Sequence, residues 1–397
     1  MKRKAFYFIL TLVLFTVFAQ SCFYSPKYMY RVIAWQDADY DDFKRFKSAP
    51  IEAPDTPFFF TPGTEAQKEQ LRRTFTEALE TEDLEQFLER QRTHSFIVIR
   101  NDTILYENYF NDNDRESVQT SFSVSKSILS LLVGIAIEQG HISGIDDPIT
   151  SYLPELTERD PRFEDITVGH LLSMRSGIEY SGKISFPFVT ADDPKTYYHP
   201  DLRRVALKHT NIDTLPGTRF RYNNYNALLI GLILERTTEQ PVSTYMQDNI
   251  WRRIGAEFEA SWSQDEREFE KMESGFNARA IDFAKLGRLA LNKGSWDGQQ
   301  LISRKWVSTS TQPKKGKDYV YGDPTQWTYR YFWWGIPEEN LLSDFMAIGN
   351  MGQLIYVSPR SNTIIARNGN ETDDFGDANW IIAFHKFVDA VEAIRQQ

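Results

Sequence analysis

The amino-acid sequence predicts a mixed α/β (α+β) fold, in which a mostly antiparallel sheet is flanked by helices and accompanied by an all-helical region. Two apolar runs joined by Asn101-Asp102 have the pattern of a β-hairpin. Further short apolar runs separated by turns lie between residues 328 and 370, whereas helical spacing prevails over about 144–292. Strands at both ends with helices between them indicate one sheet built from about 93–112 and 328–370.

The length and composition of the chain limit the classes of function that it can have. The 397 residues, of which 41% are hydrophobic, suffice for one large core or two closely packed ones. The formal net charge is −10 and no basic stripe is present, which argues against nucleic acid as a partner. Cys22 is the only cysteine, so no intramolecular disulfide can form.

The N-terminus has the pattern of an export signal. A basic start precedes an uncharged apolar run, Ala5–Ala19, which is followed by Ser21-Cys22. This order resembles a bacterial lipoprotein signal, in which the cysteine is lipidated and becomes the first mature residue. It implies a signal peptide at 1–21 and an exported protein of the cell envelope, held to the membrane by a lipid and facing the periplasm or the cell surface. The alternative is an ordinary secretory signal with an unrelated cysteine.

The order of elements follows from spacing and turn signals. Residues 22–62 are predicted to form a tether and then an extended segment laid over the surface, and residues 63–397 to form one large domain. Within it, 63–92 has helical spacing, the hairpin occupies 95–110, and an apolar helix begins at Ser123 and ends near Gly140.

The later elements are predicted in the same way. Helices are expected from Thr167 to Gly177 and over 201–209, 225–236, 242–254, 278–292 and 379–394. Strands are expected over 331–335, 345–348, 353–357 and 363–367.

The first candidate site is the pair Ser123 and Lys126, three residues apart at the first turn of the apolar helix. A serine hydroxyl becomes a nucleophile when a base takes its proton, and a lysine kept neutral by burial can do so. The alternative is a serine that caps the helix beside a solvated lysine. The apolar helix favours the catalytic interpretation, because a lysine on a buried helix is energetically unfavourable unless it has a function.

Tyr222 and Asn224 form the second candidate group, in a polar segment directly before another apolar helix. A tyrosine beside a lysine can be held partly as phenolate, because the positive charge favours the ionised form, and it can then act as a general base. The alternative is a loop that only caps the next helix.

The third candidate segment runs from Ala347 to Gln353 and contains Gly349 and Asn350. Glycine near a strand lets a substrate approach the backbone closely, and N–H groups at such an edge can help to form an oxyanion hole. The alternative is a strand bend marked by glycine.

Together and in this order, the three groups resemble the motifs of the serine β-lactamase and penicillin-binding superfamily. The most similar branch holds class C β-lactamases, DD-peptidases, family VIII esterases and nylon-oligomer hydrolases. Ser123-x-x-Lys126 matches the first motif and Tyr222-x-Asn224 the second. Ala347-Ile348-Gly349 stands where the third motif, usually Lys-Thr-Gly or His-x-Gly, is expected. The resemblance covers about Phe96 to the C-terminus and implies a β-lactamase/transpeptidase-like fold.

The resemblance also implies the role of each residue. Ser123 would attack a carbonyl and form an acyl-enzyme, Lys126 and Tyr222 would move the proton, and Asn224 would place the substrate amide or Lys126. Backbone N–H groups of Ser123 and Asn350 would stabilise the oxyanion, and water would release the acyl group. The implied partner is a small-molecule or peptide-like acyl substrate, with no cofactor and no metal.

One departure from the family pattern concerns the substrate. At Ala347 the chain lacks the positive or imidazole side chain that family members use near a substrate carboxylate. This difference argues against β-lactam hydrolysis and favours an esterase or amide hydrolase. DD-peptidase or β-lactamase activity is the alternative within the superfamily. A non-catalytic envelope protein that kept the fold is the rival from another class.

The remaining conspicuous residues carry other interpretations. None of the six histidines lies in a Gly-x-Ser-x-Gly setting or an i, i+4 pair, so neither a Ser-His-Asp triad nor a helix-borne zinc site is indicated. Trp334 is a candidate for the substrate cleft because it precedes the third segment, with core packing as the alternative. Tyr180 is a further candidate for the border of the cleft, and the charged run 314–317 is predicted to be a solvated loop.

Overall fold

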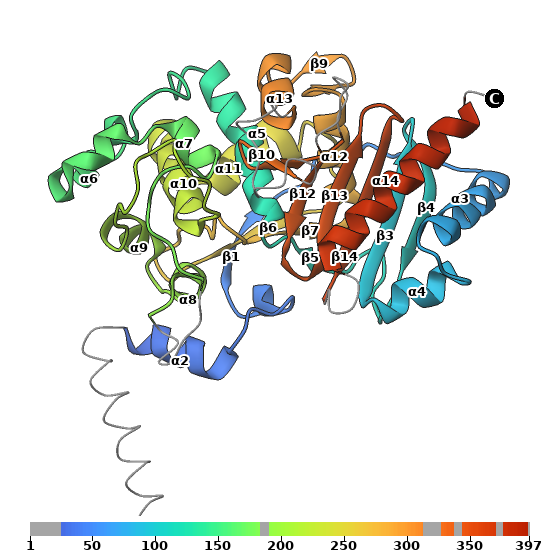
Figure 1. The fold of residues 1–397 in the computed structure, drawn as a ribbon, viewed down its shortest axis with the longest axis horizontal. Helices are drawn as coiled ribbons and strands as arrows, with labels where there is room; N and C mark the ends of the chain where they lie inside the picture. Colours follow the sequence, from blue (N-terminus) through green and yellow to red (C-terminus); the bar gives the residue numbers. More distant parts are fainter. Residues whose placement is uncertain (1–24, 183–189, 313–326, 337–343, 371–375, 396–397) are drawn as a thin grey trace, which may run out of the picture.

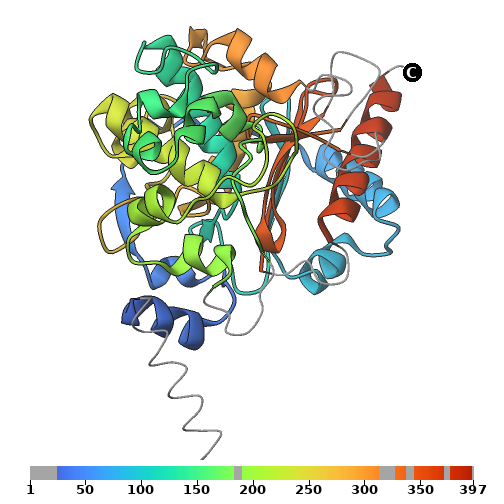
Figure 2. The ribbon, with the colours of Figure 1, turned by 60° about the vertical axis from the view of Figure 1, so that its left-hand side comes forward.

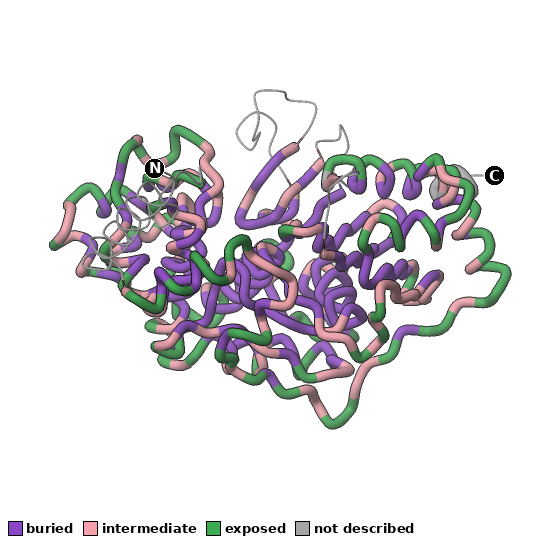
Figure 3. The backbone as a smooth tube through the Cα atoms, turned by 90° about the horizontal axis from the view of Figure 1, so that it is seen from below, coloured by how far each residue is buried: buried purple, intermediate pink, exposed green. Residues whose placement is uncertain are grey.

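The computed structural model describes residues 25–182, 190–312, 327–336, 344–370 and 376–395, and these form three layers. Figure 2 shows the main sheet nearly edge-on, with the helical region on one side and helix α14 (Gly376–Arg395) on the other. Buried residues concentrate where the layers meet (Figure 3). The predicted combination of a mostly antiparallel sheet, flanking helices and a helical region is therefore confirmed.

Within the described ranges the main sheet has eight strands in the order β10-β11-β12-β13-β14-β3-β4-β2, of which only the short pair β2/β4 is parallel. Its strands are β2 (Thr61–Pro62), β3 (Thr93–Arg100), β4 (Thr103–Tyr109), β10 (Thr328–Arg330), β11 (Trp333–Gly335), β12 (Phe345–Gly349), β13 (Gln353–Ser358) and β14 (Thr363–Gly369). Because β14 pairs with β3, the C-terminal strands join the early hairpin as predicted. Asn101 and Asp102 both have positive φ angles, which a two-residue hairpin turn requires.

Helices α3 (Glu65–Ala78), α4 (Leu84–Arg90) and α14 cover the outer face of this sheet (Figure 1). The ring of Phe75 in α3 stacks on Phe387 in α14, with centroids 3.9 Å apart, and edge-to-face on Phe96 of β3. The helical spacing over 63–92 is thus confirmed, as two helices whose apolar faces share one core with the sheet.

Helix α5 (Val124–Glu138) runs through the centre of the molecule, between the main sheet and the helical region (Figure 1). All residues from Val124 to Ala136 are buried. Gly134 leaves room for the indole of Trp306, because a Cβ there would stand 2.2 Å from the Cδ1 atom. The same indole donates to the Ser130 carbonyl at 2.8 Å. Packing on every side therefore holds the first turn of α5 in place.

The helical region comprises α6 (Glu155–Arg159), α7 (Val168–Leu172), α8 (Asp192–Tyr198), α9 (Leu202–Lys208), α10 (Asn224–Thr238) and α11 (Val242–Met246). Helix α12 (Ala280–Leu291) packs against β3, β13 and β14 of the main sheet, and α13 (Arg304–Thr311) packs against α5 and β11. One predicted boundary is wrong, because α7 ends at Leu172 and not at Gly177. Met174 adopts a left-handed conformation, and the Arg175 N–H donates to the His170 carbonyl at 2.9 Å, which closes the helix early.

A second, antiparallel sheet has the order β1-β6-β7-β5 and is not predicted by the sequence. Its strands are β1 (Lys47–Ile51), β5 (Val118–Thr120), β6 (Ala260–Gln264) and β7 (Phe276–Arg279). β5 leads directly into Ser123, so this sheet supports the start of α5.

The prediction of a tether and an extended segment at 22–62 is wrong for its first part. Residues 26–35 form helix α2 (Pro26–Trp35), capped by Ser25, and β1 follows. Arg31 is only 3% exposed, donates to the Tyr198 carbonyl at 3.1 Å and pairs with Glu266. We call residues 25–51 the N-terminal segment. Its partners lie far along the chain, but Ser25-Pro26 before an amphipathic run is a local helix signal that the prediction missed.

Some predictions fall on residues that are not described. The signal peptide at 1–21, Cys22 and the charged run 314–317 all lie outside the described ranges. No helix in the described part of the chain combines the length and apolar character that a bilayer crossing needs.

Candidate active site

Ser123 and Lys126 lie together at the start of α5. The Lys126 Nζ donates to the Ser123 Oγ at 2.9 Å. Ser123 stands at the cap position, but its side chain makes no capping hydrogen bond. Lys126 is 1% exposed, so it is not a solvated lysine. The interpretation of this pair as a helix cap beside a surface charge is therefore excluded.

The surroundings of Lys126 favour its neutral form. Its Nζ also donates to the Glu273 backbone carbonyl at 2.8 Å and lies 5.0 Å from the centre of the Tyr222 ring. Burial lowers the pKa of Lys126 to about 7, and the charges of Glu273 and Asp193 oppose this only in part. At neutral pH a large fraction of this amine can accept a proton from Ser123.

Tyr222 contacts both Ser123 and Lys126. Burial raises the pKa of the Tyr222 phenol, and a hydrogen bond with Ser123 opposes the rise only in part. The ring stacks on Trp334 at 6.0 Å and meets Tyr329 edge-to-face. This direction favours the protonated phenol over the predicted phenolate, because an aromatic environment desolvates the hydroxyl, and the role of Tyr222 as the base stays a prediction.

Asn224 begins α10 and points toward the same region. Its Nδ2 donates to the Tyr180 hydroxyl at 2.8 Å, and Tyr180 in turn donates to Asp193. The Asn224 Oδ1 is buried without a hydrogen-bond partner. Its amide therefore contacts Tyr180 and not Lys126, and its free oxygen can accept a hydrogen bond from a substrate N–H.

The end of β12 reaches the backbone of the nucleophile. A Cβ on Gly349 would stand 2.2 Å from the Ser121 carbonyl oxygen and 3.1 Å from the Ser123 nitrogen, so only glycine permits this approach. Asn350 follows directly and lines the cavity described below. Ala347 is fully buried and does not reach that cavity.

Ser123, Tyr222, Asn224 and Asn350 open into one cavity of about 490 Å³. Sequence patterns miss much of its wall. These further lining residues are 36–38 of the N-terminal segment, Phe122, Asp193, Pro194, Tyr197, Tyr198, Glu273, Ser274 and Met351. They come from separate parts of the chain, and no local motif marks them. Trp334 does not line the cavity but supports it through its stacking on Tyr222.

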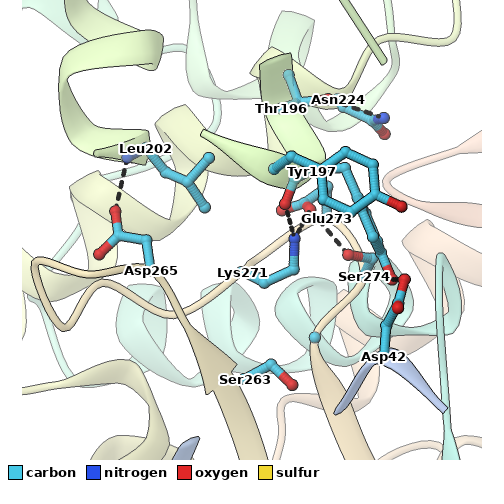
Figure 4. Close-up of polar contacts among 12 residues, drawn as sticks. Asp42, Thr196, Tyr197, Leu202, Asn224, Ser263, Asp265, Lys271, Glu273 and Ser274 are labelled. Atoms are coloured by element: carbon cyan, nitrogen blue, oxygen red, sulfur yellow. Dashed lines mark hydrogen bonds and ion pairs between the residues drawn. The ribbon is translucent and has the colours of Figure 1, made fainter. Parts of the chain in front are cut away.

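A polar network backs this cavity (Figure 4). Lys271 is 1% exposed, donates to the Tyr197 carbonyl, and lies 3.4 Å from the Glu273 Oε1. The Ser274 hydroxyl donates to the same Oε1 at 2.8 Å. Since the Glu273 backbone carbonyl accepts from Lys126, this network also holds one partner of the candidate base.

The described residues contain no cluster of three or more histidine, cysteine or acidic side chains with the geometry of a metal site. The arrangement itself offers a serine hydroxyl beside a buried amine, with backbone N–H groups nearby.

Comparisons with known proteins point the same way. The family model described as Beta-lactamase matches residues 81–385. The 6-aminohexanoate-dimer hydrolase of Paenarthrobacter ureafaciens is 27% identical over 303 residues, which cover 72% of this chain and 74% of that protein.

Solved structures extend the similarity to the fold. A putative 6-aminohexanoate-dimer hydrolase from Bacillus anthracis superposes with a TM-score of 0.76 at 21% identity, covering 94% of this chain and 95% of that one. A family VIII carboxylesterase superposes with a TM-score of 0.60 at 15% identity, covering 80% and 97%. At these identities the two structures are evidence for the fold alone.

Proposed function

Since the chain belongs to the β-lactamase family of serine hydrolases, we propose that it hydrolyses an ester or amide through an acyl-enzyme on Ser123. The observation that carries this proposal is the 2.9 Å hydrogen bond between the Lys126 Nζ and the Ser123 Oγ. It joins a nucleophile to a buried amine at the wall of an open cavity.

The first half of the reaction follows from the protonation states. Neutral Lys126 takes the proton of Ser123 while the Oγ attacks the substrate carbonyl carbon. The oxyanion that forms is stabilised by the backbone N–H groups of Ser123 and Asn350. Tyr222, which keeps its proton at neutral pH, passes it to the leaving group and is reprotonated from Lys126. The Ser123 ester and a free alcohol or amine result.

The second half reverses the roles. Water attacks the acyl carbon, Lys126 accepts its proton through Tyr222, and the Ser123 Oγ leaves with that proton. Asn224 supports the step by holding the acyl group, because its unpartnered Oδ1 accepts from an amide N–H. No metal or cofactor takes part in these steps.

The cavity wall supports an ester or amide over a β-lactam. Ala347 is buried, and none of the described lining residues is a lysine, arginine or histidine that would hold a substrate carboxylate. A relative named 6-aminohexanoate-dimer hydrolase acts on an amide, which supports amide hydrolysis as one form of the activity.

A labelling experiment tests the mechanism. We expect a fluorophosphonate probe to modify the purified protein at Ser123 and to leave Ser123→Ala unmodified. Short-chain p-nitrophenyl esters should be hydrolysed well above nitrocefin, and Ser123→Ala should lower kcat/KM by about 1,000-fold or more.

Three results would change the proposal. Nitrocefin turnover at the rate of a true β-lactamase would favour β-lactamase activity, and release of D-Ala from peptides ending in D-Ala-D-Ala would favour a DD-peptidase. An absence of labelling by any acylating probe would favour the non-catalytic envelope protein.

We also propose that the protein is an exported lipoprotein of a bacterial envelope, anchored through Cys22. The proposal rests on the basic start, the apolar run and Ser21-Cys22. Mass spectrometry of the mature N-terminus should find a diacylglyceryl group on Cys22. An unlipidated N-terminus, or one that retains residues 1–21, would contradict the anchor.

A further inference from the structure

Two residues that line the cavity carry buried polar atoms without a hydrogen-bond partner. The Tyr198 hydroxyl and the Glu273 Oε2 have no hydrogen-bond partner, and both residues line the cavity. Tyr198 is 3% exposed and Glu273 is 1% exposed. A buried polar group that lacks a partner costs stability, which a bound ligand with suitable donors can restore. A carboxylate can only accept hydrogen bonds, so a ligand that pairs with the Glu273 Oε2 must offer a hydrogen-bond donor.

The charge of the residues that line the cavity indicates which kind of hydrogen-bond donor a ligand should carry. Asp37, Asp193 and Glu273 bring three carboxylates to the wall, and no cationic side chain stands among the described lining residues. Lys271 lies behind Glu273 and compensates it in part, at 3.4 Å from Oε1, but leaves Oε2 free. Beyond the catalytic Lys126, the cavity thus presents acceptors and negative charge.

The N-terminal segment completes this wall. Residues 36–38 line the cavity directly after α2, and they precede the part of the chain that the family model matches, 81–385. The segment is held by the buried Arg31 and by the pairing of β1 with β6. Tyr198 belongs to the same contact, since its carbonyl accepts from Arg31 and its ring lies 5.8 Å from Trp35.

We propose that Tyr198, Glu273 and Asp37 form a subsite for a protonated amine on the substrate, and that the N-terminal segment supplies its outer wall. The proposal rests on the proposed function, because it names the substrate class of the same cavity. A protonated amine offers three N–H donors and one positive charge, which suits the free oxygens and the carboxylates. The site selects against an acyl substrate that carries a carboxylate at the same position.

Ligands of matched length test the subsite. Hexylammonium, hexan-1-ol and hexanoate should be titrated into the full protein by calorimetry, which does not require turnover. Hexylammonium should bind at least about tenfold more tightly than either of the others, and its advantage should shrink at high salt. It should also inhibit hydrolysis of a neutral p-nitrophenyl ester competitively.

Two variants separate the subsite from the general fold. Tyr198→Phe removes only an unpartnered hydroxyl, so it should leave thermal stability unchanged or higher while weakening hexylammonium about threefold. Asp37→Asn, at an exposed position, should weaken hexylammonium by a similar factor. Tyr30→Phe and Asp55→Asn serve as controls, because Tyr30 is 63% exposed on α2 and neither residue lines the cavity.

The outcomes distinguish the two proposals. Equal binding of the three ligands, or variants that match their controls, would overturn the subsite even if Ser123 is labelled and neutral esters are hydrolysed. Preferential binding of hexylammonium without labelling or hydrolysis would uphold the subsite and overturn the proposed catalysis.

Discussion

Burial gives Lys126 a pKa of about 7, and this value governs the expected pH dependence. The neutral amine is the form that accepts the Ser123 proton, so activity is present above pH 7 and is lost as the pH falls through that value. We expect kcat/KM for a neutral ester to fall about tenfold for each pH unit below about 6. Lys126→Arg should abolish activity at every pH, because a guanidinium stays charged.

Circular dichroism over the same pH range would serve as the control for folding. An acid limb near pH 4 to 5 would contradict the prediction, because it would assign the base to a carboxylate and not to Lys126.

The protonated phenol of Tyr222 leads to a prediction that depends on the leaving group. A p-nitrophenolate leaves without a proton, whereas the amine of an anilide needs one. We therefore expect Tyr222→Phe to lower kcat/KM by about 100-fold on a p-nitroanilide and by less than about tenfold on the matching p-nitrophenyl ester. If Tyr222→Phe lowers kcat/KM equally on both substrates, Tyr222 acts instead as the base that takes the proton of Ser123.

Individual residues differ in how far the sequence reveals them. Ser123 and Lys126 are visible because the helix period places residues i and i+3 on one face. Asp193, Tyr198 and Glu273 are not, because each reaches the cavity through tertiary contacts with distant parts of the chain. The protonation state of Tyr222 also depends on its packing against Trp334 and could not follow from a motif.

At the scale of elements, the end of β12 must touch the start of α5. Gly349→Ala would drive a Cβ to 2.2 Å from the Ser121 carbonyl. We expect a loss of about 1–3 kcal/mol in the free energy of unfolding and a fall of at least about tenfold in kcat, since the oxyanion donors would separate. Thermal unfolding and ester kinetics would measure both. Gly144→Ala is the matched control, because its Cβ meets nothing within 4 Å.

A Gly349→Ala variant that behaves like this control would show that the strand end moves freely relative to the nucleophile. Both the close approach of β12 and the proposed oxyanion donors would then need revision.

The elements that the sequence reveals are those with a strong local pattern. The hairpin, α5 and the C-terminal strands each carry an apolar period or a turn signal, and each is found where it was expected. The second sheet lacks such a signal, since β1 is short, mostly exposed and pairs with β6 more than 200 residues later. Helix α2 does carry a local signal, a Ser25 cap followed by Pro26 and an amphipathic run, which the prediction of a tether missed.

At the scale of the whole molecule, the N-terminal segment contacts the later part of the chain through Glu266. Arg31 and Lys27 both contact the Glu266 Oε1, but their side chains are 4% and 52% exposed. We expect Arg31→Ala to lower the free energy of unfolding by about 2–4 kcal/mol, because it removes a buried ion pair with Glu266 and leaves the carbonyl of the buried Tyr198 without its donor, and Lys27→Ala by less than about 1 kcal/mol. Thermal unfolding of the two variants would measure the difference.

The same two variants test whether the N-terminal segment contributes to substrate binding in the cavity. Since residues 36–38 line the cavity, loosening the segment in Arg31→Ala should speed proteolytic cleavage before β1 and raise KM, while Lys27→Ala leaves both unchanged. Limited proteolysis and ester kinetics on the same preparations provide the two readouts. If cleavage is faster but KM stays constant, the segment is a support for the fold and its place in substrate binding is lost.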